Sequence, residues 1–185
     1  MGIQYFIGID ISKESLNWAV CNANKIILEL VSGNDIKSIT KTVLSIQREL
    51  KFKIPSAVFC MEHTGIYNNP VLHFLSKRSC TIWVENAIHI QKTIGLQRGK
   101  NDKVDAHRIA VYAVKNKEEL NGYKPRRESI EQLKVLSSLR DQLVAMKKEI
   151  ATRINEYQKF GDKTVSTLML KASKQTQQGI EKDLF

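Results

Sequence analysis

The apolar and polar positions of the first hundred residues alternate between strand patterns and helix patterns. Three short apolar runs, separated by turn residues, predict three antiparallel strands, and they read QYFIGIDI, SLNWAVC and KIILELV. The segment from Asn34 to Leu50 begins with a capping residue and carries apolar residues at helical spacing, which predicts a helix. Two further strands are predicted in SAVFCM and TIWVE, with a helix in TGIYNNPVLHFLSKR between them.

The order of these elements is typical of one fold. Three strands, a helix, and then strands alternating with helices is the order found in ribonuclease H-like proteins. We therefore expect an α/β domain over residues 1–122, with a mixed five-stranded sheet, flanking helices and a last helix from Asp102 to about Lys117. In that architecture an aspartate on the first strand faces an acidic residue at the end of the fourth strand.

The pattern changes after the basic stretch YKPRR at residues 123–127, which we interpret as a linker. The segment from Glu128 to Phe160 predicts one helix of roughly 50 Å. Its apolar residues form a seam of about three heptads until Arg153 interrupts it; they are Leu136, Leu139, Leu143, Met146 and Ile150. The seam predicts a coiled coil, and with it a homodimer or higher oligomer. We interpret the polar tail, residues 161–185, as the start of a further domain that is missing.

Composition narrows the class of partner. The 185 residues are 42% hydrophobic, which is enough for a real core, and the formal charge of +10 favours phosphate-rich partners. Three cysteines without a CxxC pair argue against a disulfide framework or a zinc site and fit a reducing cytosol. The sequence shows no secretion signal and no apolar run of membrane-spanning length, so we expect a soluble, cytoplasmic protein.

Four acidic residues are the candidate catalytic and metal-binding groups: Asp10, Glu62, Asp102 and Asp105. Each has an ordinary structural explanation, as a strand end, a surface acid, a helix N-cap and a first-turn charge, respectively. At the start of a helix, however, the Cβ atoms of Asp102 and Asp105 would lie roughly 5–6 Å apart and repel each other without a cation. In the expected fold all four converge. Such a cluster could hold two Mg²⁺ or Mn²⁺ ions that clamp a phosphodiester.

Basic residues surround the last two acids. The segment from Asn86 to Lys117 contains seven Lys and Arg residues and only two acids, Asp102 and Asp105, so its net charge is 7 − 2 = +5. We expect phosphate contacts with DNA from the basic residues nearest the acids, which are Lys92, Arg98, Lys100, Lys103 and Arg108. A solvated charged face is the alternative. The four histidines do not form a ligand set, although His63 and His107 flank candidate acids.

Three ordered blocks, GIDISKESLNWAV, MEHTGIY and KNDKVDAHRIAVYA, together resemble the signature blocks of the DEDD insertion-sequence transposases. This family has a RuvC-like N-terminal domain and includes site-specific DNA invertases related to Piv. The helix LRDQLVAMKKEIATRINEY also resembles the family's coiled-coil region, so the resemblance covers roughly residues 3 to 160. It implies that Asp10, Glu62, Asp102 and Asp105 are catalytic acids that bind Mg²⁺.

The resemblance also implies DNA recombination, and a structured guide RNA as a second partner. Family members carry a C-terminal domain with a nucleophilic serine, and we find no segment that could house it before Phe185. We therefore expect an N-terminal piece that lacks the serine domain needed for independent recombination.

Three other readings stay open. A RuvC-like junction nuclease would cut branched DNA with metal ions and no serine. An actin-like ATPase would use GIDIS as a phosphate loop, but a second Asp-Gly loop is not evident. A non-catalytic remnant that binds nucleic acid and dimerises through its helix is the third.

Overall fold

The computed structural model of the chain describes residues 2–23, 25–94, 102–125 and 127–184. The chain folds as two compact units, Met1–Pro125 and Arg126–Phe185. Tyr123, which we expected in the linker, belongs to the first unit, because its backbone N–H donates to the carbonyl oxygen of Ile82 at 2.7 Å. Among the described helices, none is long and apolar enough to cross a membrane.

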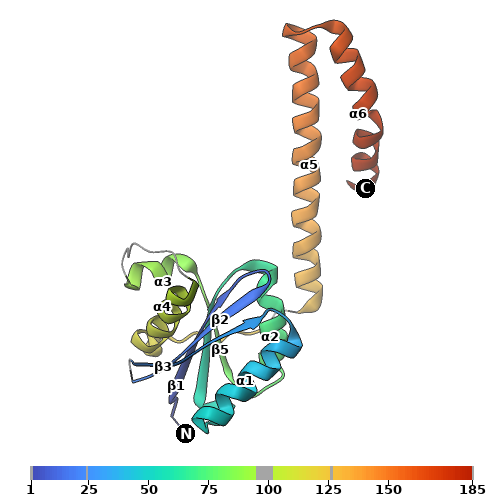
Figure 1. The fold of residues 1–185 in the computed structure, drawn as a ribbon. Coiled ribbons are helices and arrows are strands. Elements are labelled where there is room, and N and C mark those ends of the chain that lie inside the picture. Colours follow the sequence, from blue (N-terminus) through green and yellow to red (C-terminus); the bar gives the residue numbers. More distant parts are fainter. Residues whose placement is uncertain (1, 24, 95–101, 126, 185) are drawn as a thin grey trace. The chain divides into compact units, whose positions relative to one another are not determined.

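The first unit is built on one five-stranded sheet (Figure 1). Its strands are β1 (Tyr5–Ile11), β2 (Ser15–Asn22), β3 (Lys25–Gly33), β4 (Ala57–Glu62) and β5 (Thr81–Glu85). Their order across the sheet is β3-β2-β1-β4-β5. The first three strands are antiparallel neighbours, whereas β4 pairs in parallel with both β1 and β5. This is the ribonuclease H-like, mixed five-stranded sheet that the sequence predicts.

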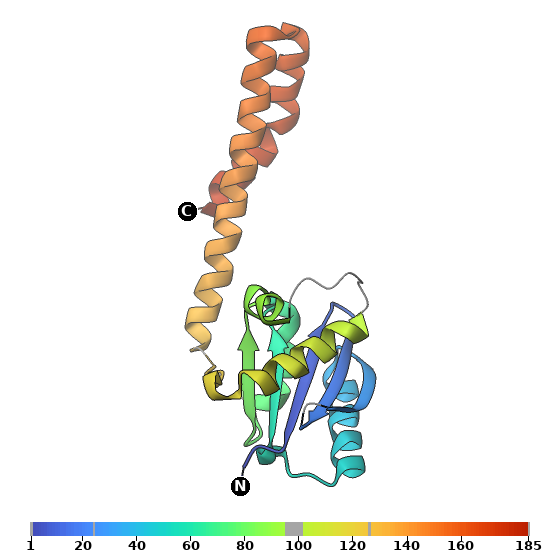
Figure 2. The same ribbon diagram turned by 90° about the vertical axis from the view of Figure 1, so that its left-hand side faces the viewer.

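Helices cover both faces of the sheet (Figures 1 and 2). On one face, α1 (Ile36–Leu50) and α2 (Asn69–Ser76) pack on aliphatic and aromatic residues at alternate strand positions. On the other face lies α4 (Asp102–Lys115), preceded in the chain by α3 (Ala87–Ile94). The core under α4 joins strand residues from the intervening positions to alanines of the helix. Small strand side chains lie at its centre and large ones also contribute, and its members include Ala19, Cys21, Val58, Cys60, Phe6 and Trp83 from the strands and Ala106, Ala110 and Ala113 from α4.

The second unit is a pair of helices, α5 (Glu128–Phe160) and α6 (Lys163–Leu184). They lie side by side as a hairpin (Figure 1), with Ile154 and Ile180 buried and Lys147 Nζ 2.6 Å from Glu181 Oε1. The expected polar tail at residues 161–185 is therefore wrong as a description of this segment. The reason is local: the Asp162 carboxylate accepts from the amides of Thr164 and Val165 and so caps α6, a helix that the sequence pattern does not predict.

Candidate active site

One residue from each strand lines up in a row across the sheet. The register pairs Val31 with Asn17, Asn17 with Asp10, and Glu62 with Glu85. The parallel pairing of β1 with β4 extends to Ile9 and Met61, and one further step brings Asp10 beside Glu62. We call these five residues, Val31, Asn17, Asp10, Glu62 and Glu85, the sheet row. All five lie on the face that α4 covers, since their neighbours along the strands pack into the opposite core.

Asp10 and Glu62 are the central acids of the sheet row. Adjacent strands are ~4.8 Å apart, so these two carboxylates project from neighbouring backbones in the same direction. Both residues are half-buried, whereas Ile9 and Met61 beside them are fully buried on the other face. The acids that the sequence predicted at the first and fourth strands are thus brought together by the parallel pairing of β1 with β4.

Asp105 approaches this pair from α4. Burial raises the pKa of Glu62, and the negative charge of Asp105 raises that pKa further. The Asp105 carboxylate in turn accepts an ion pair from Arg108 Nη1 at 2.7 Å, one helical turn further on. Arg108, which we expected to contact DNA phosphate, therefore already neutralises part of the acidic cluster.

Only part of the remaining predicted site residues lies in the described part of the structure. The helix α4 begins at Asp102, but the side chains of Asp102 and Lys103 lie outside the described part of the structure, as do residues Arg98 and Lys100. Lys92 is exposed on α3. The described side chains include no group of three or more acidic, His or Cys residues spaced to hold a metal ion. Carboxylate oxygens at Asp10, Glu62 and Asp105 nevertheless have the chemistry that Mg²⁺ and Mn²⁺ prefer.

A buried asparagine fixes the turn that follows Glu62. The side chain of Asn68, which is 2% exposed, donates from Nδ2 to the backbone carbonyl of Glu62 at 2.8 Å. Its Oδ1 accepts from the Thr64 amide at 2.6 Å and from the Thr64 hydroxyl at 3.0 Å. Asn34 adds a second tie, because its amide group donates both to the Ser12 carbonyl and to the Tyr67 carbonyl. The turns after β1 and β4 are therefore held to each other.

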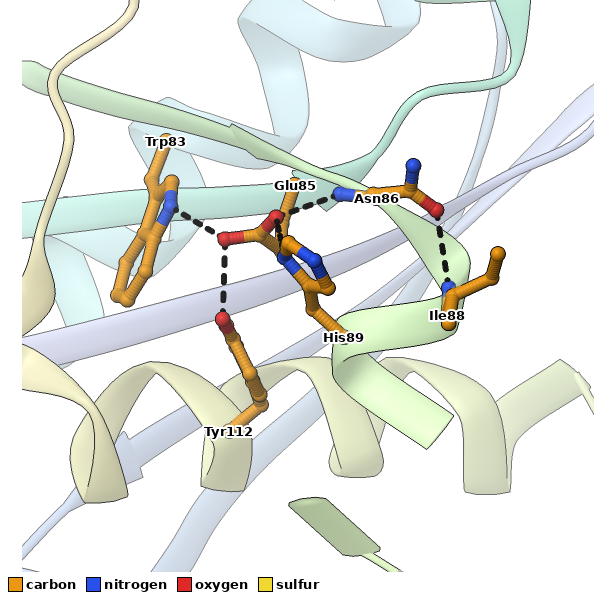
Figure 3. A network of polar contacts seen from close by, with 6 residues as sticks. All are labelled: Trp83, Glu85, Asn86, Ile88, His89 and Tyr112. Atoms are coloured by element: carbon orange, nitrogen blue, oxygen red, sulfur yellow. Dashed lines mark hydrogen bonds and ion pairs between the residues drawn. The ribbon is translucent and has the colours of Figure 1, made fainter. Parts of the chain in front are cut away.

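Glu85, the acid at the end of the sheet row, is the centre of a polar network (Figure 3). Its carboxylate accepts hydrogen bonds from Trp83 Nε1 at 3.1 Å, Tyr112 Oη at 2.9 Å and the Asn86 amide at 2.7 Å, and it contacts His89 Nδ1 at 2.9 Å. Burial by itself raises the pKa of Glu85, but the bonds from Asn86, Tyr112 and His89 hold the pKa below its usual value. Glu85 thus joins β5 to α3 and α4.

Glu85 is not among the acids predicted from the sequence, although the strand pattern around it carries a signal. TIWVE ends in an acid directly after an apolar strand, as VFCME does at Glu62. The structure separates the two by their surroundings. Glu85 has four partners, which suits a structural role, whereas Glu62 has its pKa raised by burial and a like charge, which suits a group that awaits a cation.

The chain was compared with models of protein families and with curated proteins. A family model described as a transposase, that of the DEDD transposases of the IS110 type, matches residues 7–158. A search of curated proteins found no match.

Solved structures with a similar arrangement include RuvC of Thermus thermophilus in complex with a Holliday junction substrate, at 10% identity and a TM-score of 0.49, over 63% of this chain and 96% of that one. A second structure of Thermus thermophilus RuvC has 12% identity and a TM-score of 0.46 over the same shares. A Bacteroides thetaiotaomicron protein of unknown function with an actin-like ATPase fold has 12% identity and a TM-score of 0.42, over 52% of this chain and 39% of that one.

Proposed function

We propose that this chain, which belongs to the DEDD transposase family, binds DNA and uses its acidic cluster to cut and transfer phosphodiester strands. The observation that carries the proposal is the position of Asp10 beside Glu62, one step beyond the Ile9–Met61 pair of β1 and β4, with Asp105 close enough to raise the pKa of Glu62. Carboxylates gathered in this way cost free energy unless they bind cations. A DNA backbone brought to them would be repelled for the same reason.

Asp10, Glu62, Asp102 and Asp105 would hold Mg²⁺ or Mn²⁺ through their carboxylate oxygens. When bound, such ions would polarise the scissile phosphate and lower the pKa of a bound water, so that the hydroxide nucleophile forms more readily. The protein's own contribution is to keep the ligands in place. Parallel pairing fixes Asp10 and Glu62, Asn68 fixes the turn after Glu62, and Arg108 holds Asp105. The sheet and α4 therefore act as a rigid frame for the reacting strand.

DNA is the substrate that we propose, and a structured guide RNA is a second partner. Two features support nucleic acid as the ligand: the formal charge of +10, and the concentration of basic residues around α4. Lys92 on α3 is exposed and available for phosphate contact. The RNA partner rests on membership of the family rather than on any one contact.

The test uses the full chain, Mn²⁺ and two labelled DNA probes, a linear duplex and a four-way junction. We expect Mn²⁺ binding and Mn²⁺-dependent DNA cutting, and we expect Asp10→Asn and Glu62→Gln each to weaken Mn²⁺ binding by more than about tenfold. Glu14→Gln, at an exposed acid in the turn after β1, is the matched control and should change neither. Mn²⁺ binding that survives both active-site variants would overturn the proposal. Cutting confined to the four-way junction would instead favour a junction nuclease.

A further inference from the structure

A hollow of about 210 Å³ lies at the Val31–Asn17 end of the sheet row, next to Asp10. It is formed by β2, β3 and α4, and its lining residues are Asn17, Trp18, Glu29, Leu30, Val31 and His107. Two of these, Asn17 and Val31, are members of the sheet row itself. The hollow therefore continues the candidate active site away from Glu62, across the antiparallel half of the sheet.

Asn17 is a largely buried polar residue in the wall of this hollow. It sits directly opposite Asp10 in the β1–β2 pairing, on the same face of the sheet, and is 7% exposed. Within the described residues, the Asn17 side chain makes no hydrogen bond, and its polar atoms are not among the fully buried ones, so the amide is open to the hollow that it lines. A largely buried amide that lines a hollow in this way can hydrogen-bond to a ligand that enters it.

The other walls complete a mixed apolar and polar surface. Val31 is 59% exposed and offers an aliphatic face on β3. Across the hollow, His107 Nε2 on α4 lies 2.7 Å from Glu29 Oε1, so an imidazole and a carboxylate stand together at the rim. The hollow is smaller than the ~300–1,000 Å³ that encloses a whole small molecule, which favours one unit of a longer chain as its occupant.

We propose that this hollow binds the nucleotide next to the scissile phosphodiester. Asn17 lies one strand spacing, ~4.8 Å, from Asp10 on the same face of the sheet, which is within reach of a nucleotide joined to a phosphate at Asp10. A phosphate at Asp10 and Glu62 would therefore bring its neighbour to Asn17. The nucleotide packs its apolar surface on Val31 and hydrogen-bonds to Asn17, and His107 and Glu29 bind its edge. This inference rests on the proposed function, because it takes DNA as the ligand.

The experiment measures the affinity of the full chain for a fluorescent four-way DNA junction in Ca²⁺, together with Mn²⁺ binding in the absence of DNA. Asn17→Ala should weaken DNA binding roughly tenfold, which is the loss expected for about one hydrogen bond, and leave Mn²⁺ binding within about twofold. Asn22→Ala, an exposed asparagine at the far end of the same strand, should change neither. The matched pair separates the hollow from a general effect on β2.

A second variant and a cross-link guard against a simple folding defect. Val31→Asp changes an exposed residue and should also weaken DNA binding by about tenfold or more, because its charge would repel the strand. A photoreactive p-benzoylphenylalanine in place of Val31 should cross-link to the DNA, whereas the same group in place of the exposed Leu44 on α1 should not.

DNA affinity unchanged in Asn17→Ala and Val31→Asp, with no cross-link from position 31, would overturn the proposed hollow and leave the metal-dependent function standing. A parent chain that binds no DNA in Ca²⁺ would overturn both. Loss of Mn²⁺ binding along with DNA binding in Asn17→Ala would show that Asn17 supports Asp10 rather than the nucleotide.

Discussion

Gly8 of β1 and Ala110 of α4 are in direct backbone contact. A Cβ atom added to Gly8 would lie 2.4 Å from the amide nitrogen of Ala110 and 2.2 Å from the carbonyl oxygen of Ala106. Gly8 stands two residues before Asp10, on the same face of the strand. The close approach therefore sets how near α4, and Asp105 with it, comes to the acids on the sheet.

We expect Gly8→Ala to displace α4 and to reduce the free energy of unfolding by about 2–3 kcal/mol. The clash is with backbone atoms, so a rotamer change cannot relieve it. Chemical denaturation monitored by circular dichroism measures the loss, and Mn²⁺ binding should fall with it. Gly122→Ala is the matched control, because a Cβ there would meet nothing within 4 Å. A Gly8→Ala protein as stable as the parent would contradict the close contact.

The second prediction concerns Glu62 and pH. Its pKa in the folded protein is raised above the usual 4.5, so folding disfavours the ionised form. Protonated Glu62 therefore contributes to the stability of the fold at acid pH, and this contribution is lost as pH rises through the pKa of Glu62 in the folded protein. Glu62→Gln should therefore stabilise the metal-free protein at neutral pH, by less than about 1 kcal/mol because the group is partly open to solvent. Thermal unfolding at several pH values without metal measures this gain.

In the presence of Mn²⁺ the parent chain should become more stable than Glu62→Gln, because the parent binds the ion and the variant binds it weakly. Glu14→Gln serves as the control, because this acid is exposed. If Glu62→Gln lowers the stability of the metal-free protein, Glu62 is a structural residue and the acids do not repel each other.

Asn68 is the subject of the third prediction. Asn68→Ala removes the donor to the Glu62 carbonyl and leaves buried backbone groups unpaired, which should cost about 1–3 kcal/mol of unfolding free energy. It should also weaken Mn²⁺ binding, measured by calorimetry at a temperature where the variant is folded, because Glu62 is no longer held. The control Asn69→Ala changes the adjacent, exposed asparagine. Normal Mn²⁺ affinity in a folded but less stable Asn68→Ala protein would limit Asn68 to a structural role.

The sheet and its acids could be predicted because the information is local. Asp10 and Glu62 each lie near the end of an apolar strand, and pairing of those strands is enough to bring them together. Asn17 could not be identified in this way. Its place beside Asp10 depends on the β1–β2 register, and its burial depends on where α4 crosses the sheet.

The second unit shows a different limit. The apolar seam of α5 predicts a partner on another chain, but α6 packs on the same helix. Ile154 is buried, and the seam residues Leu143 and Ile150 are half-buried, so α6 takes up part of the predicted seam. A sequence rich in Lys, Ser and Gln gave little sign of α6, because only a few of its residues need to be apolar to pack on one side.

The last prediction concerns the apolar side chains of α5 that α6 does not cover. Leu136, Leu139 and Met146 of the seam are 62%, 48% and 52% exposed, so a stripe of large side chains on α5 faces water in the single chain. Burying each is worth roughly 1.5–3 kcal/mol, which can offset the entropy lost on association. We expect a homodimer whose population rises with concentration, and Leu136→Asp with Leu139→Asp should convert it to monomer in sedimentation equilibrium. Ser137→Asp, on the same helix but outside the seam, should leave the dimer intact. A parent chain that stays monomeric at high concentration would show that the exposed seam is not a dimer interface.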